Sequence, residues 1–150
     1  MRIAIASDHA GFLAKEALGK RLAALGHGVE DFGCRSAEAC DYPDFVIPAA
    51  RAVAGGRCDR GFVLGGSGNG EAMAANKVPG IRAAVVTDDF TAEMARRHND
   101  ANVASFGTRV LAEERILALA GIFLSTPFEG GRHLRRVEKI GIYEKGPRGG

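Results

Sequence analysis

Short apolar runs alternate with longer helix-forming runs from one end of this chain to the other. The apolar runs predict strands at residues 3–6, 29–32, 61–64, 83–86 and 103–106. The runs between and after them predict helices at residues 12–25, 44–54, 71–75, 89–97, 112–124 and 132–143. Strands of this length separated by helices are typical of βαβ units, which build parallel sheets covered by helices on both faces. Because such crossovers are right-handed, the pattern predicts an α/β protein with a doubly wound, five-stranded parallel sheet.

Length and composition favour a single compact domain. The chain has 150 residues, of which 46% are hydrophobic, and this suits one domain with a single core. We expect that domain to cover residues 1–144 and the glycine-rich tail, residues 145–150, to be disordered. Charged residues of both signs make up 25% of the chain and the formal net charge is +2. Composition therefore gives no case for a nucleic-acid partner or for binding to an acidic membrane surface.

Targeting and redox features favour a cytoplasmic protein. No apolar run approaches the roughly 18 residues that span a bilayer. The charge at Asp8 comes too early for the apolar core of a signal peptide. Cys34, Cys40 and Cys58 are odd in number and lack the spacing of a disulfide or metal motif, so we expect reduced thiols. The role of these three cysteines stays open.

The segment Gly65-Gly-Ser-Gly-Asn-Gly-Glu71 carries the strongest functional signal. It leads from a predicted strand into a predicted helix, where a glycine-rich turn leaves backbone N–H groups free to converge on an anion. It matches neither the P-loop pattern nor the dinucleotide fingerprint, and a tight turn without a ligand needs fewer glycines. Glu71 puts a carboxylate where a phosphate cradle would not favour one. The anion could therefore be a phosphate or a charge that develops during a reaction.

Most other unusual polar residues follow predicted strands, at the sheet edge where ligands of such folds bind. Asp8 and His9 follow the first strand, and Arg109 follows the fifth. Helix capping is the alternative explanation for Asp8 and His9, for residues 41–44 and for residues 98–102.

Arg132 and Arg136 lie four residues apart in the last predicted helix, so they share one of its faces. Two guanidinium groups on one face can bind a phosphate dianion. A solvated basic face is the commoner explanation for such a pair.

Six motifs, taken together, resemble the type B ribose-5-phosphate isomerases, which share a superfamily with galactose-6-phosphate isomerase. They are Ser7-Asp-His-Ala-Gly11, Asp41-Tyr-Pro-Asp44, Gly66-Ser-Gly-Asn-Gly70 with Ala74-Ala-Asn-Lys-Val-Pro-Gly80, His98-Asn-Asp-Ala-Asn-Val103, Gly107-Thr-Arg-Val110 and Gly130-Gly-Arg-His133. They occur in the family's order and cover the chain up to about Glu144. The resemblance implies a Rossmann-like, three-layer α/β/α sandwich, which agrees with the alternating pattern.

The resemblance also implies an activity, the interconversion of ribose 5-phosphate and ribulose 5-phosphate through a cis-enediolate, a reaction of the pentose phosphate pathway. Many members carry a cysteine base at the position of Gly65, which this chain lacks. The chain resembles instead the subgroup with a glutamate at the position of Glu71, which becomes the expected base. Ser67 and the backbone N–H groups of the loop, including those of Gly66, Gly68 and Gly70, would hold the enediolate oxygens.

Further roles follow from the same resemblance. His98 would open the sugar ring with Asp8 assisting, and Asn99 would orient sugar hydroxyls. The implied phosphate ligands are His9, Arg109, Arg132 and Arg136, and Tyr42 is a further implied substrate contact.

The family is dimeric with composite active sites. We therefore expect a homodimer, or a dimer of dimers, in which His98, Asn99 and Arg109 face the loop of the partner subunit. No metal or organic cofactor is implied. Two alternatives stay open: an isomerase for another sugar of four to six carbons, phosphorylated or not, and a non-catalytic phosphate- or nucleotide-binding module.

Overall fold

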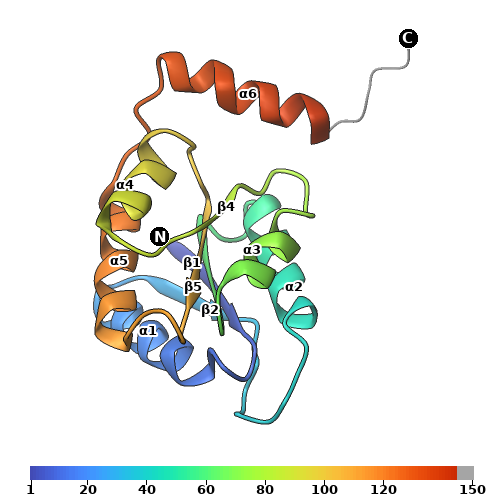
Figure 1. Ribbon diagram of the computed structural model, residues 1–150, viewed down its shortest axis with the longest axis vertical. Coiled ribbons are helices and arrows are strands. Elements are labelled where there is room, and N and C mark those ends of the chain that lie inside the picture. Colours follow the sequence, from blue (N-terminus) through green and yellow to red (C-terminus); the bar gives the residue numbers. More distant parts are fainter. Residues whose placement is uncertain (145–150) are drawn as a thin grey trace.

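The structure is a computed structural model that describes residues 1–144. The expected disordered tail, residues 145–150, lies outside the described residues. Within residues 1–144 the strands are β1 (Arg2–Ser7), β2 (Gly28–Asp31), β3 (Arg60–Gly65), β4 (Ala83–Val85) and β5 (Val103–Gly107). The helices are α1 (Phe12–Ala24), α2 (Pro43–Ala54), α3 (Asn69–Ala75), α4 (Asp89–Arg97), α5 (Glu113–Ser125) and α6 (Arg132–Glu144) (Figure 1). Every predicted element is present, with ends displaced by at most two residues.

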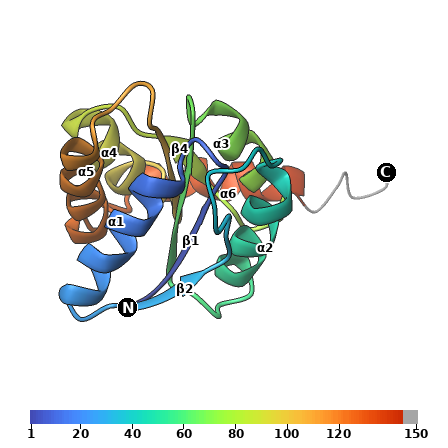
Figure 2. The same cartoon turned by 90° about the horizontal axis from the view of Figure 1, so that it is seen from below.

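The strands form one parallel sheet in the order β2-β1-β3-β5-β4. Helices α1, α4 and α5 cover one face of the sheet, and α2 and α3 cover the other (Figure 2). The predicted α/β fold with a five-stranded, doubly wound parallel sheet is therefore confirmed. The chain leaves β1 toward β2 on one side and reaches β3 on the other, so the topological switch point lies between β1 and β3. In open α/β sheets, ligands bind beyond the carboxyl ends of the strands at this point.

Each face of the sheet has its own hydrophobic core in the described chain. On one face, Phe62 of β3 stacks on Phe106 of β5 at 5.8 Å between ring centroids and meets Phe123 of α5 edge-on. On the other face, Val63 packs with Val46 of α2 in the second core. Because β3 and β5 are buried on both faces, their sequences are continuous apolar runs rather than alternating ones.

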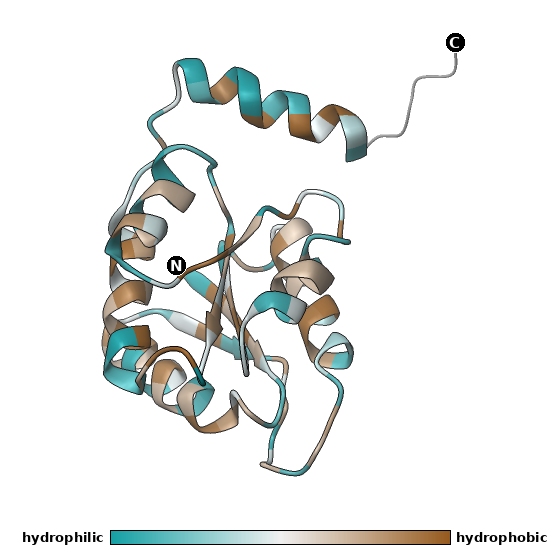
Figure 3. Ribbon diagram, viewed as in Figure 1, coloured by the Kyte–Doolittle hydropathy of each residue, from teal (hydrophilic) through white to brown (hydrophobic). Residues whose placement is uncertain are grey.

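Helix α6 lies outside these layers (Figure 1). Within Arg132–Glu144 only His133 is buried, and Leu134, Ile140 and Tyr143 are exposed. Hydrophobic and hydrophilic positions alternate along this helix (Figure 3). A cavity of about 640 Å³ separates the apolar side of α6 from residues around β4. None of the helices in residues 1–144 has the length and apolar character needed to cross a membrane.

Candidate active site

The glycine loop that joins β3 to α3 is held tightly against β5. Gly68 has a left-handed backbone conformation (φ 81°), and a Cβ there would lie 3.0 Å from the carbonyl carbon of Phe106. The Ser105 hydroxyl donates to the Gly68 carbonyl at 2.6 Å. Gly107 is needed for the same reason, since a Cβ on it would come within 2.6 Å of the Ser67 carbonyl oxygen. The glycines at these two positions therefore let the loop close onto β5 without steric overlap.

A cavity of about 390 Å³ opens beyond the carboxyl ends of β1 and β3, at the switch point of the sheet. Eight of the residues predicted for the site line it: Asp8, His9, Tyr42, Gly66, Ser67, Gly70, Glu71 and Arg109. The predicted residue Gly68 is buried behind it and shapes the loop. We call this group of lining residues the loop site.

Glu71 is the buried acid of the loop site. Only 3% of its surface is exposed, and this burial raises the pKa of its carboxyl, with the nearby charge of Asp8 adding to the effect. The carboxylate fills the space in front of Gly65, where any Cβ would overlap with it. Gly70 has a similar constraint, because a Cβ there would lie 2.7 Å from the ring of Tyr42. Small residues thus make room for a carboxylate and a phenol at one end of the cavity.

Asp8 and His9 have local structural partners as well as access to the cavity. The Asp8 carboxylate accepts a hydrogen bond from the Gly11 N–H at 2.9 Å, so it also supports the entry to α1. Nδ1 of His9 lies 3.3 Å from both the backbone nitrogen and the carbonyl oxygen of Cys40. That contact fixes the ring and leaves Nε2 for another partner. The N-cap of α1 is Gly11 and makes no side-chain capping bond, so Asp8 and His9 combine these local contacts with access to the cavity without capping the helix.

Arg109 differs in position from what the family resemblance implies. The resemblance groups it with residues that face the loop of a partner subunit, whereas its guanidinium lies against this chain's own loop. A Cβ on Gly66 would be 3.4 Å from its Nη1, and the Arg109 N–H donates to the Gly66 carbonyl at 3.0 Å. The backbone pairing that ends β5 beside β3 carries Arg109 to the loop site.

The four remaining predicted residues, His98, Asn99, Arg132 and Arg136, lie away from the loop site. His98 ends α4, which precedes β5, whereas the glycine loop follows β3. The two positions are therefore at opposite edges of the sheet, separated by the five residues of β5, about 16 Å of strand. Asn99 is exposed, and its carbonyl accepts from Nε of Arg82 at 3.0 Å. One chain alone does not bring the two groups together.

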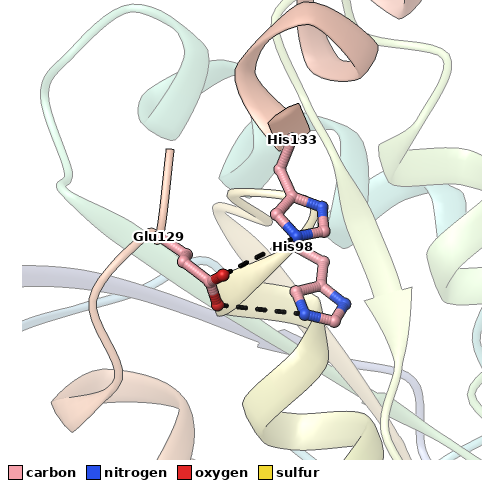
Figure 4. A group of neighbouring side chains, drawn as sticks. All are labelled: His98, Glu129 and His133. Carbon is pink, nitrogen blue, oxygen red and sulfur yellow. Dashed lines mark ion pairs between the residues drawn. The ribbon is translucent and has the colours of Figure 1, made fainter. Parts of the chain in front are cut away.

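His98 belongs to a second cluster, formed with Glu129 and His133 (Figure 4). The two imidazole rings are stacked at 4.1 Å between centroids with 8° between their planes. The Glu129 carboxylate lies 4.0 Å from Nε2 of each ring. Burial lowers the pKa of His133, and the charges of His98 and Arg132 lower it further. The sequence gives little sign of this cluster. His133 occurs in the motif Gly130-Gly-Arg-His133, but Glu129 belongs to no motif and its spacing from His98 matches no known pattern.

The cluster does not fit a tetrahedral metal ion well. Its possible ligand atoms lie within 4.8 Å of one another, which is compatible with a common ion. Nε2 of His133, however, accepts a hydrogen bond from Nε of Arg132 at 3.4 Å, which occupies the lone pair that a zinc ion would need. The geometry fits an imidazole stack beside a carboxylate instead.

Comparison with known proteins gives consistent matches over nearly the whole chain. The family model for ribose/galactose isomerases matches residues 3–140. Ribose-5-phosphate isomerase B of Escherichia coli (strain K12) is 42% identical over 144 residues, covering 96% of this chain and 97% of that protein. The structure of ribose-5-phosphate isomerase B from Clostridium thermocellum superposes with a TM-score of 0.95 at 48% identity, covering 97% of this chain and 98% of the other. The enzyme from Mycoplasma genitalium, solved with bound ribulose-5-phosphate, gives a TM-score of 0.93 at 39% identity, with 97% of both chains covered.

Proposed function

The chain belongs to the ribose/galactose isomerase family and is an aldose–ketose isomerase, and from this premise we propose that it interconverts ribose 5-phosphate and ribulose 5-phosphate. The observation that carries the proposal is the buried Glu71 carboxylate at the edge of the glycine-loop cavity. An aldose–ketose isomerase has to move a proton between two adjacent carbons. The bound ribulose-5-phosphate of the Mycoplasma genitalium relative supports the choice of substrate.

Glu71 is the proposed base. In the forward direction its carboxylate takes the proton from C2 of the open-chain aldose, and the C1 carbonyl oxygen gains charge as a cis-enediolate forms. The proton of the C2 hydroxyl passes to the C1 oxygen, and the same carboxyl returns the carbon-bound proton to C1, which leaves a hydroxyl at C1 and the ketone at C2. Because burial raises the pKa of Glu71, the group can both accept and release a proton more readily near neutral pH than an exposed glutamate can.

The loop beside Glu71 is the proposed stabiliser of the enediolate. The Ser67 hydroxyl and the backbone N–H groups of Gly66, Ser67 and Gly70, the loop residues that line the cavity, can donate hydrogen bonds to oxygens that become negative during the reaction. Within the same cavity, His9 and Arg109 are proposed to bind the substrate phosphate, and Tyr42 to contact the sugar.

Ring opening and the rest of phosphate binding are assigned to His98, Asn99, Arg132 and Arg136 of a second copy of this chain. The separation of these residues from the loop site within one chain supports the assignment, since a complete site needs both groups. The exposed apolar side chains of α6, with the cavity beside β4, offer a surface that a second copy could cover. We therefore propose a homodimer, with a dimer of dimers as a possible larger assembly, whose two active sites are each built from two chains.

Mixing two inactive variants is expected to restore activity if the sites are composite. Glu71→Gln and His98→Asn each inactivate both sites of their own homodimer. A heterodimer of the two has one site with both substitutions and one with neither. Unfolding and refolding an equal mixture should recover about one quarter of the wild-type activity, because half of the dimers are mixed and each has one intact site.

The refolding experiment has its own controls. Each variant refolded alone reports its background, and wild-type protein refolded alone gives the recovery of the procedure. A mixture no more active than the average of the two variants would mean that Glu71 and His98 act from the same chain.

A turnover screen tests the proposed substrate directly. Aldose phosphates of four, five and six carbons are offered at equal concentration, with unphosphorylated ribose and allose alongside. Ribose 5-phosphate should give the highest kcat/KM, and loss of the phosphate should lower it strongly because the proposed site has three arginines for that group. A higher kcat/KM for another sugar would identify that sugar as the substrate in place of ribose 5-phosphate. Binding without turnover of any sugar would favour the alternative of a phosphate-binding module.

A further inference from the structure

The cluster of His98, Glu129 and His133 contains two side chains that the proposed reaction does not yet use. We propose that Glu129 and His133 are positioning residues, which hold the imidazole of His98 in the orientation that sugar-ring opening requires. The inference deepens the proposed function and rests on it, since it takes His98 as the group that exchanges protons with the cyclic sugar.

The stack fixes the plane of the His98 ring. His98 ends α4 and is only half-buried, so its side chain would otherwise have room to turn. His133 is 3% exposed, and its backbone N–H donates to the Gly130 carbonyl at 3.0 Å. Nε2 of His133 lies 3.4 Å from Nε of Arg132. An imidazole held in this way presents a fixed face, against which His98 packs at 4.1 Å.

Glu129 is itself held firmly by α4. Arg97 contacts the Glu129 carboxylate at 3.0 Å and 3.2 Å, and the Glu129 N–H donates to the Arg97 carbonyl at 3.0 Å. The carboxylate therefore has a set position beside Nε2 of His98. The other ring nitrogen of His98, Nδ1, points away from Glu129 (Figure 4). The carboxylate thus lies beside one ring nitrogen while the second faces away from it, so Nδ1 is the nitrogen placed to exchange a proton with a sugar.

The charged surroundings of the two imidazoles bear mainly on His133. Two rings stacked this closely cannot both be positive without strong repulsion. Burial lowers the pKa of His133, as do the charges of His98, Arg132 and Arg136, so His133 is the ring that stays neutral. The charged groups that face the stack are Glu129 before α6, Arg132 and Arg136 on α6, and Arg97 on α4. Glu129 supplies the negative charge among them and lies 4.0 Å from Nε2 of His98.

A protonated imidazole is what ring opening needs. The anomeric hydroxyl loses its proton to a base, the C1 carbonyl forms, the bond between C1 and the ring oxygen breaks, and the ring oxygen takes a proton from the acid. His98, presented by Glu129 and His133, is that acid. The proton returns to His98 from the group that accepted the anomeric one, so no net proton is consumed.

Glu129→Gln tests the inference, with Glu93→Gln as the matched control. Both glutamates form ion pairs with Arg97, but only Glu129 lies beside the two histidines. Glutamine keeps an oxygen that can accept from Arg97, so the loop should hold its place. We expect Glu129→Gln to lower kcat with ribose 5-phosphate by about tenfold and to change the pH profile of kcat, because the imidazole of His98 loses the carboxylate that lies beside it. Glu93→Gln should leave kcat and the pH profile within about twofold of wild type.

An acyclic substrate separates ring opening from the later steps. The 5-phosphate of 4-deoxyribose has no free hydroxyl that could close a furanose ring, yet its length and phosphate match those of ribose 5-phosphate. Glu129→Gln should convert this analogue as fast as wild type does. If wild type does not accept the analogue, the pH profile with ribose 5-phosphate decides.

The outcomes distinguish this inference from the proposed function. Unchanged kcat and pH profile in Glu129→Gln, or equal slowing with both substrates, would overturn the positioning role while leaving the isomerase assignment intact. Absence of ribose 5-phosphate turnover by the wild-type protein would instead overturn the proposed function.

Discussion

Replacing Glu71 with glutamine is expected to lower kcat by about 10³-fold, the range found for removing a general base. The amide has nearly the same size and can remain in the space in front of Gly65, but it cannot take a proton from carbon. Binding of a phosphate-bearing inhibitor should be almost unchanged, because the proposed phosphate ligands are other residues. Steady-state kinetics and calorimetric titration with a non-isomerisable sugar phosphate measure the two effects separately.

The same variant should be more stable than wild type at neutral pH. Because burial raises the pKa of Glu71, its carboxyl binds a proton more tightly in the folded protein than in the unfolded chain. Stability is therefore lost as pH rises from the ordinary glutamate range through the raised pKa of the folded state. Glutamine removes that cost, so Tm should rise at pH 7 to 8, and the gain should disappear at acidic pH.

Glu113→Gln serves as the control, since Glu113 is an exposed carboxylate at the start of α5. It should change neither kcat nor the pH dependence of Tm. Near-wild-type turnover by Glu71→Gln would exclude Glu71 as the base, and a lower Tm at neutral pH would contradict the raised pKa.

The sheet and its helices could be predicted because local pattern and tertiary environment agree. The run at 61–64 is apolar throughout since β3 is buried on both faces in the centre of the sheet. Helix α4 begins at the predicted residue, Asp89, because Asp88 and Thr91 form a reciprocal capping box. The start of α3 was displaced to Asn69, since Gly68 takes a left-handed conformation and lets the helix begin earlier than the first good helix former.

The loop site was predictable for a related reason. The carboxyl ends of parallel strands lie along one edge, so Asp8, the glycine loop and Arg109 had to come near one another once the strands were located. Sequence does not report where the last helix lies relative to the rest of the fold. The pairing of Glu129 with Arg97 and the stacking of His133 on His98 depend on that placement, and neither follows from spacing along the chain.

Steric exclusion between Gly65 and Glu71 leads to the second large effect. A methyl group on Gly65 would overlap with the Glu71 carboxylate, so Gly65→Ala must displace the acid or the end of β3. We expect kcat to fall about as far as in Glu71→Gln, with a loss of about 1 to 3 kcal/mol in unfolding free energy from overpacking. Denaturant titration and kinetics on the same preparation check both. Gly121→Ala is the control, because Gly121 lies in α5, away from the loop site, and a Cβ there meets nothing within 4 Å; it should leave kcat unchanged.

Replacing Glu71 with alanine and Gly65 with cysteine in the same chain should transfer the role of the base from the carboxylate to the thiol. The family resemblance implies that many members use a cysteine at the position of Gly65, and in this chain the Glu71 carboxylate occupies that space. Glu71→Ala vacates it, so Gly65→Cys in that background can point its sulfur at the glycine loop, where backbone N–H groups favour a thiolate. The kcat of the double variant should therefore be about tenfold or more above that of Glu71→Ala alone, and its activity should become sensitive to iodoacetamide.

Gly65→Cys with Glu71 retained should be less active than the double variant, because the thiol and the carboxylate compete for one volume and their effects are not additive. Full activity in that single variant would show that thiol and carboxylate fit side by side, and the exclusion argument would fail.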